Sequence, residues 1–114
     1  MPTERQFKRR HLVYYLPVTD TESGTRCGRL VDITPAGLML VHDKPFPVGS
    51  VYSLTIDFSG VPDLSTQVRV RGRCQWSQPD VNPEYHVAGF EFLDVSEEAR
   101  DHILEAVEIV GFQD

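Results

Sequence analysis

One short segment near the start of the chain carries side chains suited to holding a phosphate group. The run Arg5-Gln6-Phe7-Lys8-Arg9 places two arginines four positions apart. A guanidinium group is always charged, its planar fork matches phosphate oxygens or the O6/N7 edge of guanine, and its flat face stacks on a base. The segment is therefore a candidate anion-binding arm, and the alternative is an ordinary basic tail that helps to keep the chain in solution.

A second cluster, Asp32-x-Thr34-x-x-Gly37, combines a carboxylate, a hydroxyl and a glycine at the spacing of a tight turn. The carboxylate can accept hydrogen bonds from N1 and N2 of a guanine, and the hydroxyl can bond a phosphate or the backbone of the turn. The glycine permits a close approach of the backbone or a positive φ. Because the same residue types are common in plain turns, a turn without any ligand is the alternative.

The motifs of several enzyme classes are missing. The chain has no Gly-x-x-x-x-Gly-Lys-Ser/Thr, no Gly-x-Gly-x-x-Gly and no Gly-x-Ser-x-Gly, which argues against nucleotide hydrolysis, dinucleotide redox chemistry and acyl transfer by an elbow serine. Asp57 and Asp63 have no spacing that makes them an acid–base pair, and the four histidines are scattered without zinc-site spacing. We therefore predict no catalytic residue, no metal site and no resident cofactor.

The elements that must position the two clusters are mostly strands. Apolar alternation and turn residues predict six of them, at residues 11–18, 26–34, 37–42, 51–58, 67–76 and 85–93. The second and third strands are expected to pair antiparallel across the turn from Thr34 to Gly37. One helix follows at about residues 96–110, with Ser96 as its N-cap. Six short strands in about 80 residues predict a mainly β fold, a small antiparallel barrel or sandwich.

The fifth predicted strand shows the clearest alternation. Its apolar face consists of Val68, Val70, Gly72, Cys74 and Trp76, and Arg69, Arg71 and Arg73 form a basic stripe on its other face. On this pattern Trp76 is best interpreted as a side chain that fills the core.

Charge is distributed unevenly along the 114 residues, whose net charge is −6. Residues 1–10 hold four basic side chains and one acidic one, which gives +3 and leaves −9 on the remainder. An acidic body repels a nucleic-acid backbone, so we expect no DNA or RNA partner. No apolar run is long enough to span a bilayer and no signal peptide is visible, so we expect a cytoplasmic protein without membrane insertion. Its two cysteines are then expected to be free thiols.

Taken together, the two clusters and the six strands resemble the PilZ family. Glu4 to Arg9 is similar to the amino-terminal arm of that family, and Val31 to Leu38 is similar to its second motif. The strand that ends in Cys74-Gln75-Trp76 and the run Val87 to Phe92 before a terminal helix are also similar. The resemblance covers nearly the whole chain and implies a six-stranded antiparallel β-barrel, at residues 11–114, with one C-terminal helix and a flexible basic arm at residues 1–10.

What the resemblance implies about function is a receptor for the bacterial second messenger cyclic di-GMP, without turnover of the ligand. Arg5 and Arg9 would hold the phosphates and the guanine edge, and Asp32 would contact the guanine or these arginines. Thr34 and Gly37 would shape the floor of the site on the barrel side. Trp76 resembles an aromatic residue that can lie beside a base, although the core position is the favoured interpretation of it.

Two other classes of function remain open. Some PilZ-like domains have lost nucleotide binding and act as protein-interaction modules, and a small β-barrel that binds nucleic acid would have to use the arginine stripe of the fifth strand. A receptor of one domain has no output module of its own, so its signal is expected to pass to a protein partner. The sequence identifies neither that partner nor the number of ligands bound.

Overall fold

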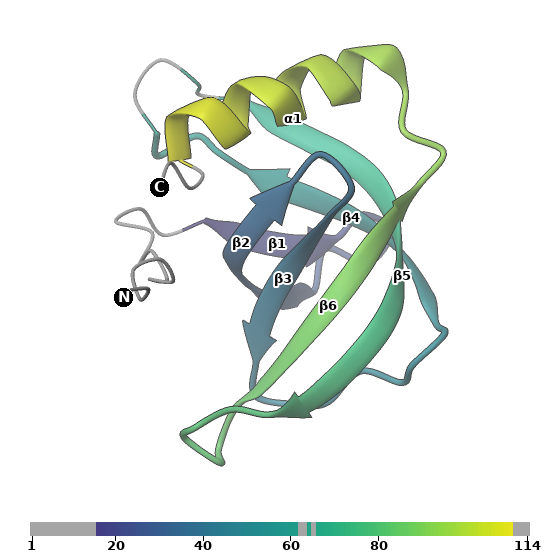
Figure 1. The fold of residues 1–114 in the computed structure, drawn as a ribbon, viewed down its shortest axis with the longest axis vertical. Helices are drawn as coiled ribbons and strands as arrows, with labels where there is room; N and C mark the ends of the chain where they lie inside the picture. The colour runs from purple at the N-terminus through teal and green to yellow at the C-terminus, as the bar shows by residue number, and fades with distance from the viewer. Residues whose placement is uncertain (1–15, 62–63, 65, 111–114) are drawn as a thin grey trace, which may run out of the picture.

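The computed structural model describes residues 16–61, 64 and 66–110. Its elements are the strands β1 (Pro17–Asp20), β2 (Arg26–Thr34), β3 (Gly37–His42), β4 (Val51–Asp57), β5 (Gln67–Pro79) and β6 (His86–Leu93), followed by the helix α1 (Glu97–Val110) (Figure 1). The proposed arm at residues 1–10 and the start of the first predicted strand, residues 11–15, lie outside the described residues.

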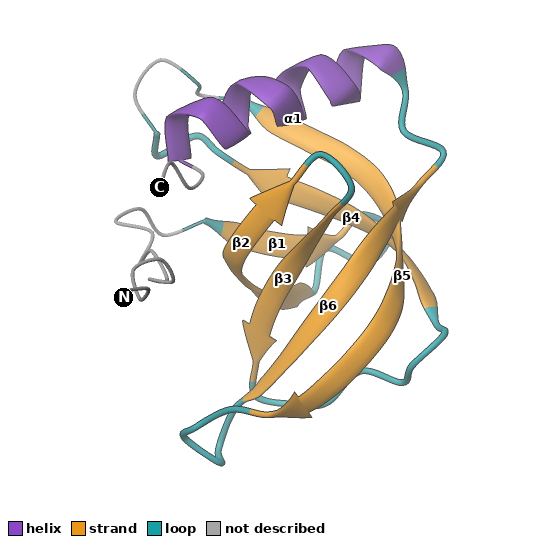
Figure 2. Cartoon of the chain, in the orientation of Figure 1, coloured by secondary structure: helices purple, strands orange, loops and turns teal. Residues whose placement is uncertain are grey.

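The six strands form one closed barrel in the order β1-β2-β3-β6-β5-β4, and every neighbouring pair is antiparallel. Figure 2 shows this wall of strands with the single helix lying across one end of it. The prediction of a mainly β, six-stranded antiparallel barrel with one C-terminal helix is confirmed.

The core fills the barrel because alternate residues of each strand point inward. On β4, for example, Leu54 and Ile56 are fully buried, while Ser53 and Thr55 between them are partly exposed. The described part of the chain has no buried polar or charged residue. The interior is therefore stabilised by apolar burial, at roughly 25 cal/mol per Å² removed from water.

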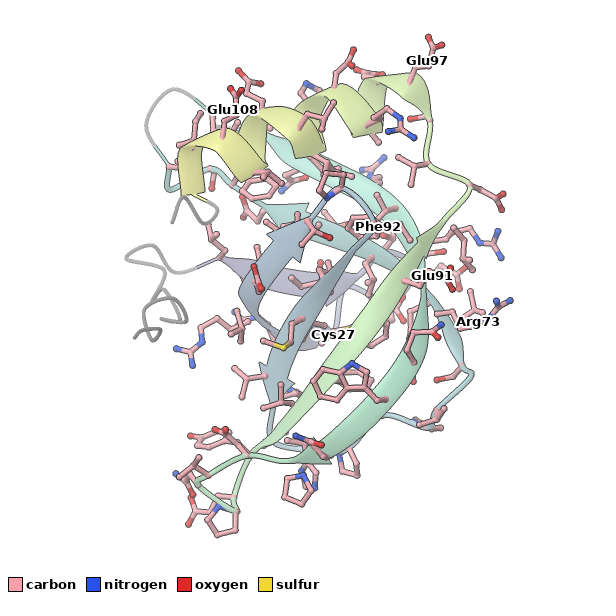
Figure 3. The ribbon with its side chains drawn as sticks, viewed as in Figure 1. Cys27, Arg73, Glu91, Phe92, Glu97 and Glu108 are labelled. Carbon is pink, nitrogen blue, oxygen red and sulfur yellow. The ribbon has the colours of Figure 1, made fainter. Side chains whose placement is uncertain are left out.

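The helix covers one end of the barrel with its apolar face. Ala99, Ile103 and Ala106 are buried there at helical spacing. The Ser96 hydroxyl oxygen accepts a hydrogen bond from the amide of Ala99 at 3.1 Å, which confirms the predicted N-cap. Figure 3 shows Glu97 near the start and Glu108 near the end of α1, both on the side away from the barrel. Within the described residues, no helix is both long enough and apolar enough to cross a membrane.

Two predicted strand ends are wrong, for the same reason. β1 continues past Val18 to Asp20, where its residues pair with β4, and β5 continues past Trp76 to Pro79, where it pairs with β6. Polar residues and a proline at these positions are typical of loops. They stay in the ladder because a partner strand supplies their hydrogen bonds.

Candidate functional site

A row of four residues crosses the outer wall of the barrel. Asp32 on β2 lies opposite Met39 on β3, and Met39 lies opposite Gly89 on β6. Gly89 in turn lies opposite Trp76 on β5. Residues directly opposite each other in neighbouring strands project from the same side of a sheet. At about 4.8 Å per strand, the row from Asp32 to Trp76 spans about 14 Å.

The adjacent row shows which side is outward. Its four members are buried and fill the barrel: Ile33, Leu38, Phe90 and Cys74. Because successive residues of a strand alternate between faces, the row from Asp32 to Trp76 faces solvent.

A β-bulge turns Asp32 toward this outer face. Leu30 pairs with Leu40, but the next residue of β3, Met39, pairs with Asp32, so Val31 is an extra residue on β2. In a regular strand Asp32 would point to the same side as Leu30, which is only 2% exposed and lies in the core. The extra residue reverses the alternation, so the carboxylate is outside and Ile33 takes the inward position.

A second bulge does the same for Trp76. Cys74 pairs with Phe90 and Trp76 pairs with Gly89, so Gln75 is the extra residue on β5. Cys74 is buried as predicted, but Trp76 is 39% exposed. The favoured interpretation of Trp76 as a core residue is therefore wrong, because that interpretation extended a strict alternation across the bulge.

The indole of Trp76 lies against the backbone of Gly89. A β-carbon at position 89 would lie 2.6 Å from Cε2 and 2.9 Å from Cζ2 of the ring, and closer still to Nε1. Three consecutive ring atoms so near one point mean that a face of the indole covers the glycine. Gly89 is buried beneath the ring, whereas Trp76 itself remains partly accessible. The outer face of the indole thus offers a flat apolar surface on which an aromatic ligand can stack.

An open hollow of about 440 Å³ lies over this part of the wall. Its lining comes from β2, β3, β5, β6 and the β2–β3 turn: Asp32, Ile33, Thr34, Ala36, Gly37, Leu38, Met39, Gln75, Trp76, Gly89, Phe90 and Glu91. We call this hollow the wall cleft. Of the residues predicted for the site, it brings together Asp32, Thr34, Gly37 and Trp76.

Thr34 and Gly37 shape the turn beside the wall cleft. The Thr34 hydroxyl oxygen accepts hydrogen bonds from the amides of Ala36 at 3.1 Å and Gly37 at 3.2 Å, which closes the turn between β2 and β3. The turn is also fastened to β6, because the amide of Phe92 donates to the carbonyl of Ala36 at 2.9 Å. Of the two uses predicted for the hydroxyl, phosphate or turn backbone, the structure shows the second.

Gly37 is needed for a close approach between strands. A β-carbon at this position would collide with the carbonyl oxygen of Phe90 on β6. Gly37 is not among the described residues with positive φ. Its function in the barrel is to let β3 and β6 come together at the edge of the wall cleft.

The charged side chains of the described cleft lining are two carboxylates. The Oδ1 atom of Asp32 accepts a hydrogen bond from the amide of Ile33 at 2.8 Å. Glu91 lies on β6 two residues beyond Gly89, and its Oε1 atom accepts a hydrogen bond from Nε2 of Gln75 at 3.1 Å. Figure 3 shows Glu91 on β6 next to Arg73 on β5. The described lining contains no basic side chain.

Glu91, Gln75 and Met39 were missed by the sequence reasoning. The alternation of β6 places Gly89 and Glu91 on the same face, opposite Phe90 and Phe92, so Glu91 could have been found by asking what shares a face with the glycine. Gln75 could not have been found in this way because it is the bulged residue. Arg5 and Arg9 lie outside the described residues, so the predicted arm stays a prediction.

Comparison with known proteins agrees with the fold. The Bacillus subtilis inhibitor of motility, MotI/DgrA, has 19% sequence identity and a TM-score of 0.65; the match covers 92% of this chain and 53% of that one, so the present chain spans about half of its length. The PilZ domain of YcgR from Escherichia coli, solved with cyclic di-GMP, has 14% identity and a TM-score of 0.58, over 84% of this chain and 80% of that one. No curated protein matches the chain significantly. The family model for the PilZ domain matches residues 3–108. The chain therefore belongs to the PilZ domain family.

Proposed function

We propose that this PilZ domain is a receptor that binds cyclic di-GMP in the wall cleft. The observation that carries the proposal is the row of outward residues across β2, β3, β6 and β5. One end of the row is the carboxylate of Asp32, and the other end is the indole of Trp76, which lies against Gly89. A purine base needs a flat surface for its face and polar groups for its edge, and the wall cleft offers both. The YcgR domain, which has a similar fold, was solved with the same ligand.

The charge distribution suggests that the wall cleft and the arm bind different parts of the ligand. Cyclic di-GMP carries two phosphate charges, whereas the described cleft lining contributes the carboxylates of Asp32 and Glu91. Phosphates are repelled by carboxylates, so cations must come from another part of the chain. The +3 segment with Arg5 and Arg9 is the natural source of them. In this arrangement the bases lie in the wall cleft and the arginines hold the phosphates.

The magnitudes are sufficient for a specific receptor. Stacking of one base on an aromatic side chain is worth about 1–3 kcal/mol, and each hydrogen bond to a charged group is worth about 1.5–3 kcal/mol. One stacked base and a few charge-assisted bonds offset the cost of immobilising a small ligand and reach a micromolar affinity, about −8 kcal/mol.

We further propose that the domain is a binding module without catalytic activity, that it works in the cytoplasm, and that it passes its signal to a protein partner. The described residues contain no group of three histidine, cysteine, aspartate or glutamate side chains placed to hold a metal ion. A ligand held between the arm and the barrel wall changes the exposed surface over β5 and β6, and that surface is what a partner protein would recognise.

Binding can be tested with the single tryptophan of the chain as the reporter. Isothermal titration calorimetry and Trp76 fluorescence should both respond to cyclic di-GMP at concentrations up to about 100 μM, well above a micromolar dissociation constant. GTP and cyclic di-AMP serve as control ligands. The absence of both heat and an emission change with cyclic di-GMP would refute the receptor function.

The second candidate is a PilZ-like protein-interaction module that has lost nucleotide binding. One observation favours it: the described cleft lining is acidic and has no cation of its own. The titration with cyclic di-GMP decides between the two functions. A protein-interaction module would not bind cyclic di-GMP even though circular dichroism shows that the domain is folded.

A further inference from the structure

We propose that Glu91 is the residue that selects guanine, by accepting hydrogen bonds from the edge of the base that stacks on Trp76. This inference rests on the proposed function and adds to it, because Glu91 lies outside both motifs that identified the site. It also gives the two carboxylates of the wall cleft different roles. Glu91 contacts the base that stacks on Trp76, and Asp32 contacts the part of the ligand at the opposite end of the row.

The register of the barrel supports this division. Trp76 lies directly opposite Gly89, and Glu91 is the next outward residue on β6. Such diagonal neighbours are about 7–8 Å apart, within reach of aromatic and long side chains. Asp32, by contrast, is three strands away from Trp76, or about 14 Å. A base on the indole therefore has one described carboxylate beside its edge, and that carboxylate is Glu91.

The Glu91 carboxylate is held in place by one hydrogen bond and can still accept others. Its Oε1 atom accepts one hydrogen bond from Gln75, the bulged residue next to Trp76. An ionised carboxylate has about four acceptor positions, so one contact leaves room for a ligand. Arg73 lies opposite Glu91 on β5, yet within the described part of the chain the two form no ion pair.

The chemistry of the carboxylate favours guanine over adenine. Guanine presents two donors side by side, N1–H and the N2 amino group, and a carboxylate accepts from both. Adenine has a lone pair at N1, which a carboxylate repels. A site that pairs with a donor rejects the analogue that lacks it, because the acceptor is then left without a partner. Glu91 is thus a specificity-determining residue for the base.

Neutralising Glu91 should change the affinity for cyclic di-GMP in the opposite direction to that expected from a purely electrostatic role. If Glu91 only contributed negative charge near the phosphates, its neutralisation would strengthen the binding of an anionic ligand. If it accepts from guanine, its neutralisation weakens the binding of cyclic di-GMP and has no such effect on cyclic di-AMP.

The experiment compares Glu91→Gln with Glu84→Gln in the full chain. Glu84 is exposed in the loop between β5 and β6 and does not line the wall cleft, so its variant makes the same change of charge away from the site. Calorimetry and Trp76 fluorescence are recorded with cyclic di-GMP and with cyclic di-AMP, and circular dichroism checks the fold of each variant.

We expect Glu91→Gln to weaken cyclic di-GMP binding about tenfold, since a charge-assisted hydrogen bond is roughly twice as strong as a neutral one, and to narrow the preference over cyclic di-AMP. Glu84→Gln should behave as the original chain. Unchanged or tighter binding of cyclic di-GMP by Glu91→Gln would overturn the role of Glu91 and leave the receptor function standing. An original chain that binds no cyclic di-GMP would overturn both.

Discussion

Replacing Gly89 with alanine should push the Trp76 indole off the barrel wall. The new β-carbon would lie 2.6 Å from Cε2 and 2.9 Å from Cζ2 of the ring, whereas carbon atoms in contact are about 3.5–4.0 Å apart. The ring must therefore move outward by about 1 Å. It has space to do so because Trp76 is 39% exposed.

The cost of this movement can be bounded from the burial of the ring. About three-fifths of the surface of Trp76 is covered, and a buried tryptophan removes up to about 250 Å² from water. Complete detachment would expose about 150 Å² and cost about 4 kcal/mol at about 25 cal/mol per Å². A ring displaced by about 1 Å keeps part of its packing, and alanine returns about 0.5–1 kcal/mol through its lower backbone entropy in the unfolded chain. We expect Gly89→Ala to lower the free energy of unfolding by about 1–2 kcal/mol.

Urea unfolding followed by circular dichroism measures this loss, and the emission spectrum of the single tryptophan shows the displaced ring by a shift to longer wavelength. Gly60→Ala is the matched control, because a β-carbon at Gly60 would have no heavy atom within 4 Å and its φ is not positive. If Gly89→Ala unfolds at the same urea concentration as the original chain, with unchanged emission, the indole does not rest on the glycine and the stacking surface proposed here is absent.

Further predictions address the arm, a buried thiol and the helix cap. Arg5→Ala and Arg9→Ala should each weaken cyclic di-GMP binding about tenfold or more without changing the thermal midpoint; calorimetry that finds full affinity in both variants would identify the segment as an ordinary basic tail. Burial, and secondarily the carboxylate of Asp20, raise the pKa of the Cys27 thiol from 9.0 to about 11, so at pH 8 it should react with a disulfide reagent only after unfolding, and rapid reaction of the folded protein would contradict its burial. Ser96→Ala removes the acceptor for the first turn of α1 and should cost about 1 kcal/mol in urea unfolding; an unchanged midpoint would show that the cap contributes no stability.

The sequence was sufficient to predict the strands because their signal is local. Along β4 and the first half of β5, apolar and polar residues alternate as expected for a barrel wall with one dry face. The helix was predictable for a similar reason, since the Ser96 cap and the apolar spacing of α1 lie within one short segment. The prediction of barrel closure came from the family resemblance and from the number of strands.

The outward direction of the site residues could not be predicted in this way. A bulge is defined by two paired strands, because one residue is extra only in relation to the partner that it fails to match. Neither Val31 nor Gln75 differs visibly from a regular strand residue in the sequence, yet each reverses the alternation that follows it. The motif therefore identified Asp32 but not the direction in which its side chain points. The alternation rule correctly predicted that Cys74 is buried, but it wrongly predicted that Trp76 is buried as well.

Closure of the barrel also restricts how another protein can recognise this domain. Many signalling domains bind an extended peptide as an additional strand, which requires a free sheet edge with unpaired backbone groups. Each of the six described strands has a hydrogen-bonded neighbour on both sides over at least part of its length, so none of them presents a free edge along its whole length. A partner that contacts the wall along β5 and β6 would meet the side chains of the wall cleft and Arg73, which lies opposite Glu91. The same residues would then serve the small ligand and the partner, which makes competition or joint binding at one face the simplest form of signal output.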